Sequence, residues 1–253
     1  MQVQGYRDTA AIGPCDLVIV ALKTTSNAAL PDLLRPLVRE GTMLLTLQNG
    51  LGNEEFLAEH FGAERVLGGL CFVGLNRIAP GVIEQYDVGR IALGEHQRAP
   101  QSRTRAVAEQ FNAAGIRCTV VEDLGLERWR KLVWNIPFNG LAVAAGGVHT
   151  ATILGDRALR EVTLSLMAET IDAANRCGFP LMPTEAETQL TRTVAMGDYR
   201  PSTLIDFEEG RPLELEAIWG APLRQAVAAG AHVPQLAMLH ALLGRLDQRR
   251  NGG

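Results

Sequence analysis

Residues 16–22 read Asp16-Leu17-Val18-Ile19-Val20-Ala21-Leu22, follow the pair Gly13-Pro14, and decide the fold. A short apolar run rich in β-branched residues is typical of a strand that is buried on both faces of a parallel sheet. After this run, the pattern predicts a helix at 26–39, a strand at 43–47, a helix at 54–61 and a further strand that begins at 66–69. This alternation of strands and helices predicts a parallel sheet covered by helices.

The remainder of the chain changes character. Residues 82–86 and 90–94 alternate like a hairpin or an extension of the sheet edge, and a helix at 101–114 and a last strand at 118–121 follow. From Leu126 onward the periodicity predicts helices near 127–145, 156–177, 184–196, 213–229 and 234–248. We therefore expect an α/β fold, with a doubly wound, Rossmann-like domain at 1–122 and an all-helical domain at 123–253.

Composition argues against several classes of function. The chain has 253 residues and a net charge of -4, which gives no electrostatic reason to expect nucleic acid or an anionic membrane as a partner. The four cysteines are scattered without a CxxC pair and the five histidines lack paired metal spacing, so we expect no disulfide framework and no bound metal. The sequence contains no signal peptide and no apolar stretch of membrane-spanning length, which predicts a cytoplasmic protein.

A doubly wound nucleotide-binding domain places a glycine-rich turn after its first strand. The partial match Gly50-Leu51-Gly52-Asn53-Glu54-Glu55 lacks the third glycine of G-x-G-x-x-G and follows the second predicted strand, so we reject it. The sheet is thus expected to lack its first β-α-β unit. That loss would leave the strand at 16–22 with an unpaired edge, which is an aggregation liability unless something covers it.

The segment from Glu127 to Asn139 is the most informative for chemistry. On a helix, Lys131, Asn135 and Asn139 lie at i, i+4 and i+8 and share one face, while apolar residues cover the other faces. Unpaired polar groups on a buried helix destabilise a fold by about 1–3 kcal/mol each, so these side chains need partners. They either bond a neighbouring domain as a structural seam or bind a ligand, and spacing alone leaves both alternatives open.

Four further positions carry a similar choice. Ser202 follows Pro201 and is either the N-cap of a helix or a ligand contact. Glu214 opens an apolar helix, where it is either a solvated carboxylate that complements the helix dipole or a site residue. Asn49 stands at the carboxyl end of the second predicted strand and Lys23 stands one unit earlier, and ligands of open α/β sheets bind outside that edge. A plain turn and a surface lysine are the alternatives there.

Together these segments resemble the ketopantoate reductase family. The strand ending at Lys23 resembles the family's lysine-ended strand, and Asn49-Gly50-Leu51-Gly52 resembles its N-G-x-G loop. The helix from Trp129 to Asn139 resembles its W-x-K-L-x-x-N-x-x-x-N pattern. Pro201 to Asp206 and Glu214 to Gly220 resemble its P-S-x-x-x-D and E-x-x-x-x-x-G patterns. The order and spacing of these motifs extend over nearly the whole chain, so the resemblance is specific.

The resemblance implies reduction of 2-dehydropantoate (ketopantoate), or of a similar 2-keto acid, to pantoate in pantothenate biosynthesis, with NADPH as hydride donor. It implies that Lys131 is the general acid that protonates the developing alkoxide, and that Glu214 is a catalytic carboxylate near this lysine and the nicotinamide end. The implied substrate-binding residues are Asn49, Asn135, Asn139 and Ser202. The implied cofactor-binding residues are Lys23, Asn49, Asn76 and Glu214.

The chain departs from the family in two respects. His149 stands where a substrate-binding asparagine is common, which leaves the identity of the 2-keto acid open. The family's first strand, glycine-rich loop, helix and second strand have no counterpart before Met1, so we expect this chain to bind NADPH far more weakly than a complete member. The choice between NADP and NAD is open as well, because the residue that reads the 2′-phosphate would belong to that segment.

Three hypotheses follow. The first is a family reductase of which part is absent from this sequence, with a partial dinucleotide-binding domain at 1–122 and a helical substrate and dimerisation domain at 123–253. The second is a truncated, catalytically inactive member that acts as a binding or regulatory protein. The third is a related dehydrogenase for another 2-keto or 2-hydroxy acid. A small 2-keto acid is the expected partner, and a homodimer is compatible with the resemblance because helical second domains of this kind often dimerise.

Overall fold

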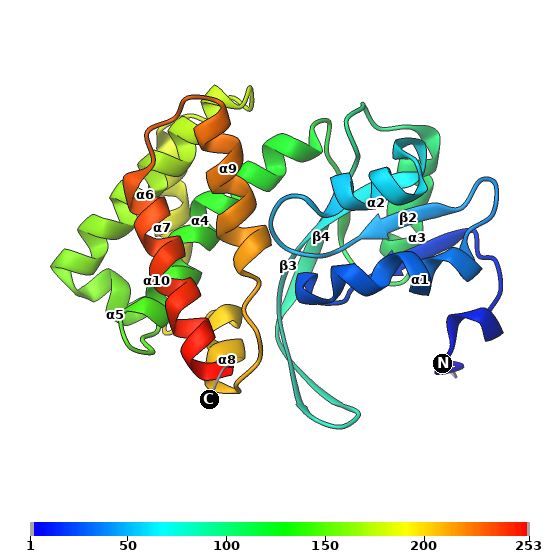
Figure 1. Ribbon diagram of the computed structural model, residues 1–253, viewed down its shortest axis with the longest axis horizontal. Helices are drawn as coiled ribbons and strands as arrows, with labels where there is room; N and C mark the ends of the chain where they lie inside the picture. The colour runs from blue at the N-terminus through cyan, green and yellow to red at the C-terminus, as the bar shows by residue number, and fades with distance from the viewer. Residues whose placement is uncertain (1–2, 252–253) are drawn as a thin grey trace. The chain divides into compact units, whose positions relative to one another are not determined.

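The computed structural model describes residues 3–251, apart from the side chains of residues 76, 86–88, 250 and 251. The chain forms two units, Met1–Leu124 and Gly125–Gly253, which we call the N-terminal and the C-terminal unit. The N-terminal unit is built on a five-stranded sheet, and the C-terminal unit consists of helices (Figure 1). This arrangement confirms the predicted fold class, a parallel-rich sheet followed by a helical region.

The sheet has the strand order β1-β2-β3-β4-β5. Its strands are β1 (Leu17–Val20), β2 (Met43–Thr46), β3 (Val66–Ala79), β4 (Val82–Glu95) and β5 (Cys118–Val120). β1, β2 and β3 are parallel, β4 is antiparallel to β3, and β5 is parallel to β4. Residues 82–95 form one continuous strand instead of the two arms of a hairpin, and β3 and β4 extend past their neighbours as a two-stranded ribbon (Figure 1).

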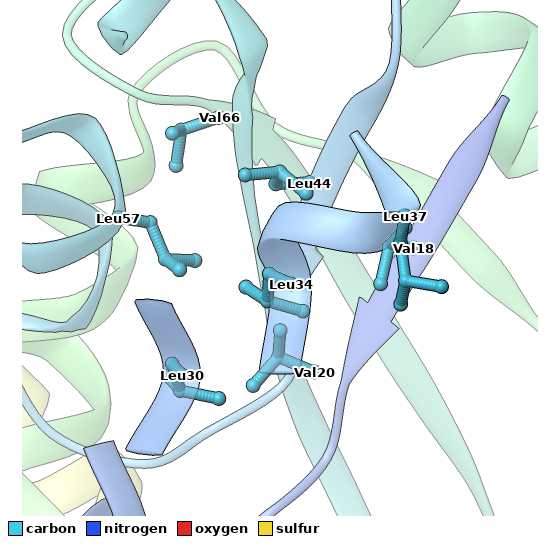
Figure 2. Close-up of a cluster of buried hydrophobic side chains, with 8 residues drawn as sticks. All are labelled: Val18, Val20, Leu30, Leu34, Leu37, Leu44, Leu57 and Val66. Atoms are coloured by element: carbon cyan, nitrogen blue, oxygen red, sulfur yellow. The ribbon is translucent and has the colours of Figure 1, made fainter. Parts of the chain in front are cut away.

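Helices cover both faces of this sheet. The elements between the strands are η1 (Thr9–Ala11), η2 (Thr24–Ala29), α1 (Leu30–Leu34), η3 (Arg35–Leu37), α2 (Asn53–Phe61), η4 (Ala63–Arg65) and α3 (Ser102–Ala113). On one face, side chains of α1 and α2 pack on β1, β2 and β3, and Figure 2 shows them pointing toward one another. On the other face, Val107 and Ala108 of α3 pack against β2 to β5. Leu44 and Leu45 lie in different clusters because neighbouring strand residues point to opposite faces.

Two expectations for the first β-α-β segment were wrong in detail. Residues 17–20 were expected to be buried on both faces, but Ile19 is 44% exposed. Ile19 lies on the first strand in the sheet order, and on its face Leu17 packs against the cluster that includes α3, whereas Ile19 is not part of that cluster. The helix expected at 26–39 is split into η2, α1 and η3, because Pro31 and Pro36 lack the N–H groups that a continuous helix would use.

The C-terminal unit packs around its longest helix. Its elements are α4 (Leu124–Ala144), α5 (Thr150–Gly155), α6 (Arg157–Arg176), α7 (Thr184–Ala195), α8 (Ser202–Glu208), the π-helix η5 (Glu216–Gly220), α9 (Ala221–Ala228) and α10 (Pro234–Asn251). A Cβ on Gly140 would meet Leu239 of α10 at 2.6 Å, so α4 and α10 are in close contact (Figure 1). The short helix α5 was not expected, and the helix expected from 213 begins only after Glu214.

A buried carboxylate ties the end of β4 to α3 and gives a pH-dependent prediction. Glu95 accepts hydrogen bonds from Arg103 Nε at 2.9 Å and Thr104 Oγ1 at 2.6 Å, and Arg98 is nearby. Burial raises the pKa of Glu95, but the hydrogen bonds and the two cations outweigh it and hold that pKa below its ordinary value. The charged carboxylate therefore stabilises the fold above its unfolded pKa, and this stabilisation is lost as pH falls through the lower folded pKa.

We expect Glu95→Gln to lower the free energy of unfolding by about 1–3 kcal/mol at neutral pH, because the arginines lose their charged partner. The difference from wild type should shrink as pH falls below about 4.3, the ordinary value for glutamate. Urea unfolding followed by circular dichroism at pH 7 and at low pH measures both quantities. A difference that stays constant with pH would contradict the assignment.

No helix within residues 3–251 combines the length and the apolar character that a membrane span requires. Among the same residues, histidine, cysteine and acidic side chains form no group of three that could hold a metal ion.

Candidate functional site

The polar face of α4 is formed as helical spacing predicts. Lys131, Asn135 and Asn139 lie within the helix Leu124–Ala144, which continues through Pro137. Asn135 and Asn139 are only 5% and 3% exposed, and Lys131 is half-buried. The helix therefore presents one cation and two recessed amides along a single line.

Asn135 is the exceptional member of this face. It is 95% buried, yet within the described residues its side-chain amide has no hydrogen-bond partner. The fully buried side-chain atoms that lack a hydrogen-bond partner do not include those of Asn135. The polar atoms of Asn135 are therefore partly accessible to solvent. A recessed, open amide of this kind loses about 1–3 kcal/mol of hydrogen bonding unless water or a ligand supplies it. Asn135 is thus suited to bind a small polar group.

Asn139 connects α4 to the start of α8. The backbone N–H of Thr203 donates to Asn139 Oδ1 at 3.4 Å, so the amide nitrogen of Asn139 is directed elsewhere and has no acceptor among the described residues. Ser202 is exposed and is the first residue of α8, with Pro201 at the N-cap position. The N-cap alternative for Ser202 was therefore wrong. Its hydroxyl lies next to the residue that contacts Asn139.

The segment before Ser202 is held along α4 by contacts that the sequence did not reveal. The Tyr199 ring lies 6.1 Å from that of Trp134, and its backbone N–H donates to Thr150 Oγ1 at 3.0 Å. Burial raises the pKa of the Tyr199 phenol. His149 Nδ1 lies 3.1 Å from Asp198 Oδ2, so the histidine that departs from the family pattern is paired with an acid of this same segment.

Glu214 is buried instead of solvated, which rules out the simple dipole role considered for it. It is 5% exposed and directly precedes the helical turn that includes the π-helix η5. The preceding N–H, of Leu213, donates to Asp247 Oδ1 of α10 at 3.2 Å. Trp219 of η5 donates from Nε1 to the carbonyl of Ile136 at 3.1 Å, which holds this turn against α4 at the level of its polar face. π-helical turns are frequent at functional sites.

The N-terminal unit brings two predicted cofactor contacts to one sheet edge. β1 and β2 are parallel and in register from Leu17 with Met43 to Val20 with Thr46, so Lys23 and Asn49 both follow strands that end at the same edge. Lys23 is exposed and Asn49 is half-buried. Asn76 is not at this edge, because its backbone lies in the projecting ribbon opposite Glu84. Its side chain lies outside the described residues.

Three amide residues next to these positions were not singled out from the sequence. Asn27, Gln48 and Asn53 form a hydrogen-bonded line between the ends of β1 and β2 and the start of α2. Gln48 and Asn53 could have been suspected because they lie within four residues of Asn49 in the sequence. Their contacts join positions 21 and 26 residues apart, which no local pattern predicts.

The comparisons with known proteins agree with this arrangement. Residues 1–98 match the family model described as ketopantoate reductase PanE/ApbA, and residues 123–247 match the model of its C-terminal part. A curated 2-dehydropantoate 2-reductase from Nostoc sp. is 42% identical over 257 residues, which cover 100% of this chain and 80% of the relative. The crystal structure of 2-dehydropantoate 2-reductase from Geobacter metallireducens GS-15 has a TM-score of 0.93 and 46% identity, and the match covers 96% of this chain and 81% of that one.

A more distant structure shares the fold alone. D-mandelate dehydrogenase with NADH and anilino(oxo)acetate has a TM-score of 0.86 at 20% identity, over 94% of this chain and 78% of that one. The family models and the relatives of 42% and 46% identity, together with the α/β unit followed by a helical unit, show that the chain is an oxidoreductase. Within this class, the chain belongs to the ketopantoate reductase family.

Proposed function

We propose that this chain reduces 2-dehydropantoate to pantoate with NADPH, as a step of pantothenate biosynthesis. The observation that carries the proposal is Asn135, a recessed amide open to solvent, placed between Lys131 and Asn139 on one helix face. The names and identities of the relatives support the keto acid, and the NADH in the D-mandelate dehydrogenase structure supports a nicotinamide cofactor. Lys23 and Asn49 are the proposed cofactor contacts of the N-terminal unit, with Asn49 also reaching the substrate.

In the proposed reaction, the bound cofactor supplies a hydride to the ketone carbon. The Lys131 ammonium stabilises the negative charge that develops on the ketone oxygen and then donates its proton there, so that one hydride and one proton convert the ketone to the alcohol. Asn135, Asn139 and Ser202 hold the substrate's hydroxyl and carboxylate, using amide and hydroxyl groups that the fold leaves available. Their role is to keep the ketone in reach of both transfers.

Glu214 is the proposed second catalytic group. Its carboxylate is buried, and the Leu213–Asp247 and Trp219–Ile136 hydrogen bonds fix the chain on either side of it. We assign Glu214 to orient Lys131 and to contact the nicotinamide end of the cofactor.

The proposal is tested by following NADPH oxidation with ketopantoate and with smaller 2-keto acids. The assay uses this chain and a fusion that carries the first strand, glycine-rich loop and helix of a family member before Met1, because this chain spans about 80% of the length of the relatives it matches. We expect the fusion to turn over, to prefer ketopantoate, and to have a higher kcat/KM with NADPH than with NADH. Folded fusion protein that binds ketopantoate without turnover would favour the alternative of an inactive binding protein.

A further inference from the structure

A line of three amides, of which Gln48 and Asn53 are buried and Asn27 is half-buried, lies next to the two proposed cofactor contacts of the N-terminal unit. Gln48 Nε2 donates to the carbonyl of Leu22 at 2.9 Å and to Asn27 Oδ1 at 2.8 Å. Asn27 Nδ2 donates to Asn53 Oδ1 at 3.0 Å, and Asn53 Nδ2 donates to the carbonyl of Asn49 at 2.8 Å. The line therefore begins at the residue before Lys23 and ends at Asn49. We call Asn27, Gln48 and Asn53 the amide line.

The amide line can adopt only one orientation of its side chains. Both of its ends are main-chain carbonyls, which accept hydrogen bonds and cannot donate them. Each amide nitrogen must therefore donate either to one of these two carbonyls or to the side-chain oxygen of the next amide, and this is the arrangement observed. Thr46 supports this direction, because its hydroxyl donates to Gln48 Oε1 at 3.0 Å. A reversed amide anywhere in the line would place two donors or two acceptors face to face.

Burial makes these hydrogen bonds consequential. Gln48 is 4% exposed, Asn53 is 2% exposed and Thr46 is fully buried, so water does not readily replace a lost partner. The turn that the line holds is otherwise easily deformed, because Gly50 and Gly52 have φ angles of 83° and 90°. The line thus supplies a fixed contact to this glycine-containing turn.

We propose that Asn27, Gln48 and Asn53 are positioning residues that lock the Lys23 turn and the Asn49–Gly52 turn into one rigid cofactor-binding edge. The proposal rests on the proposed function, since the ligand in question is the nicotinamide dinucleotide. It extends that function by naming residues that do not contact the cofactor and yet determine its affinity. Preorganised turns bind more tightly because little conformational freedom is lost on binding.

The sharpest test is Asn53→Asp. The new carboxylate still accepts from Asn27 Nδ2, but it cannot donate to the Asn49 carbonyl and repels it. At the same time it adds a negative charge at the first residue of α2, where the helix dipole favours it. Because the new charge is buried and faces a carbonyl, this dipole contribution does not offset the lost hydrogen bond, so we expect the thermal midpoint to fall. Hydrogen exchange of the Gly50–Gly52 amides should accelerate by about tenfold.

Two further variants separate the effect of charge from the effect of the hydrogen bond. Asn53→Ala removes the same bond without adding charge and should accelerate exchange in the same turn. Asn112→Asp is a control at a distant position, because Asn112 is an exposed residue of α3 that also donates to main-chain carbonyls, those of Ala108 and of Cys118 in β5. It should lower the thermal midpoint and leave the exchange of residues 50–52 at the wild-type rate.

The same variants are measured in the fusion described above, by calorimetry and steady-state kinetics. We expect Kd and KM for NADPH to rise by about tenfold in both Asn53 variants, and KM for ketopantoate to rise less, because Asn49 is only one of the proposed substrate contacts. Unchanged exchange at residues 50–52 in both variants would overturn the positioning role. If the wild-type fusion binds no NADPH, the proposed function fails, and accelerated exchange in the Asn53 variants still supports the structural role of the amide line.

Discussion

Lys131→Ala is expected to lower kcat for ketopantoate reduction in the active fusion by about 10²–10⁴-fold, the range that a positioned general acid contributes. The reason is that the half-buried ammonium on α4 is the proposed donor of the proton to the ketone oxygen, and the adjacent Asn135 and Asn139 are neutral amides that cannot replace it. Steady-state kinetics with saturating NADPH measures the change. A kcat within threefold of wild type would remove Lys131 from the role of acid.

Lys131→Arg is the informative control for this result. An arginine keeps the positive charge but does not give up its proton in proteins, so it should preserve part of the substrate affinity without restoring kcat. The scarcity of lysine in the chain makes this comparison of lysine with arginine more informative. Of its 24 lysine and arginine residues only two are lysines, Lys23 and Lys131, and both lie at proposed site positions. Elsewhere the chain uses arginine, the cation that remains protonated.

Trp219→Ala is expected to lower the free energy of unfolding of the C-terminal unit by about 3–5 kcal/mol, as for other large-to-small changes in a core. Trp219 is fully buried in η5 and donates to the carbonyl of Ile136. The variant loses the packing of the ring as well as the hydrogen bond to α4. Urea unfolding followed by circular dichroism measures the loss, and a change below 1 kcal/mol would contradict it.

Trp219→Phe separates these two contributions. It keeps most of the buried volume and removes only the Nε1 donor, so the expected loss is about 1 kcal/mol. Because η5 begins two residues after Glu214, this variant should also lower kcat by more than its loss of stability would suggest. A wild-type kcat in Trp219→Phe would indicate that the hydrogen bond to Ile136 does not help to place Glu214.

Much of the secondary structure could be predicted because its causes are local. The strands at 43–46 and 118–120 and the helices at 53–61, 102–113 and 157–176 lie close to the expected bounds, since apolar periodicity and flanking turn residues act within a few positions. Apart from the helix that Pro31 and Pro36 divide, the errors have tertiary causes. Ile19 is exposed because it lies outside the cluster that α3 forms on its face of the sheet, and the π-helix at 216–220 includes the fully buried Trp219.

The candidate site divides in the same way. The common face of Lys131, Asn135 and Asn139 follows from helix geometry alone, and so does the placement of Lys23 and Asn49 at the ends of consecutive strands. The amide line and the pair of His149 with Asp198 could not be predicted, because their members meet only after the sheet and the helices have packed.

By itself, the sequence determined the α/β-then-helical order, the family and the line of polar groups on one helix, because each depends on short-range periodicity or on ordered motifs. Only the tertiary structure decided that Glu214 is buried, that Ser202 begins its helix without capping it, and that Asn135 has an open amide with no partner among the described residues. Burial and hydrogen-bond partnership depend on residues distant in the chain, and residue spacing carries no information about them.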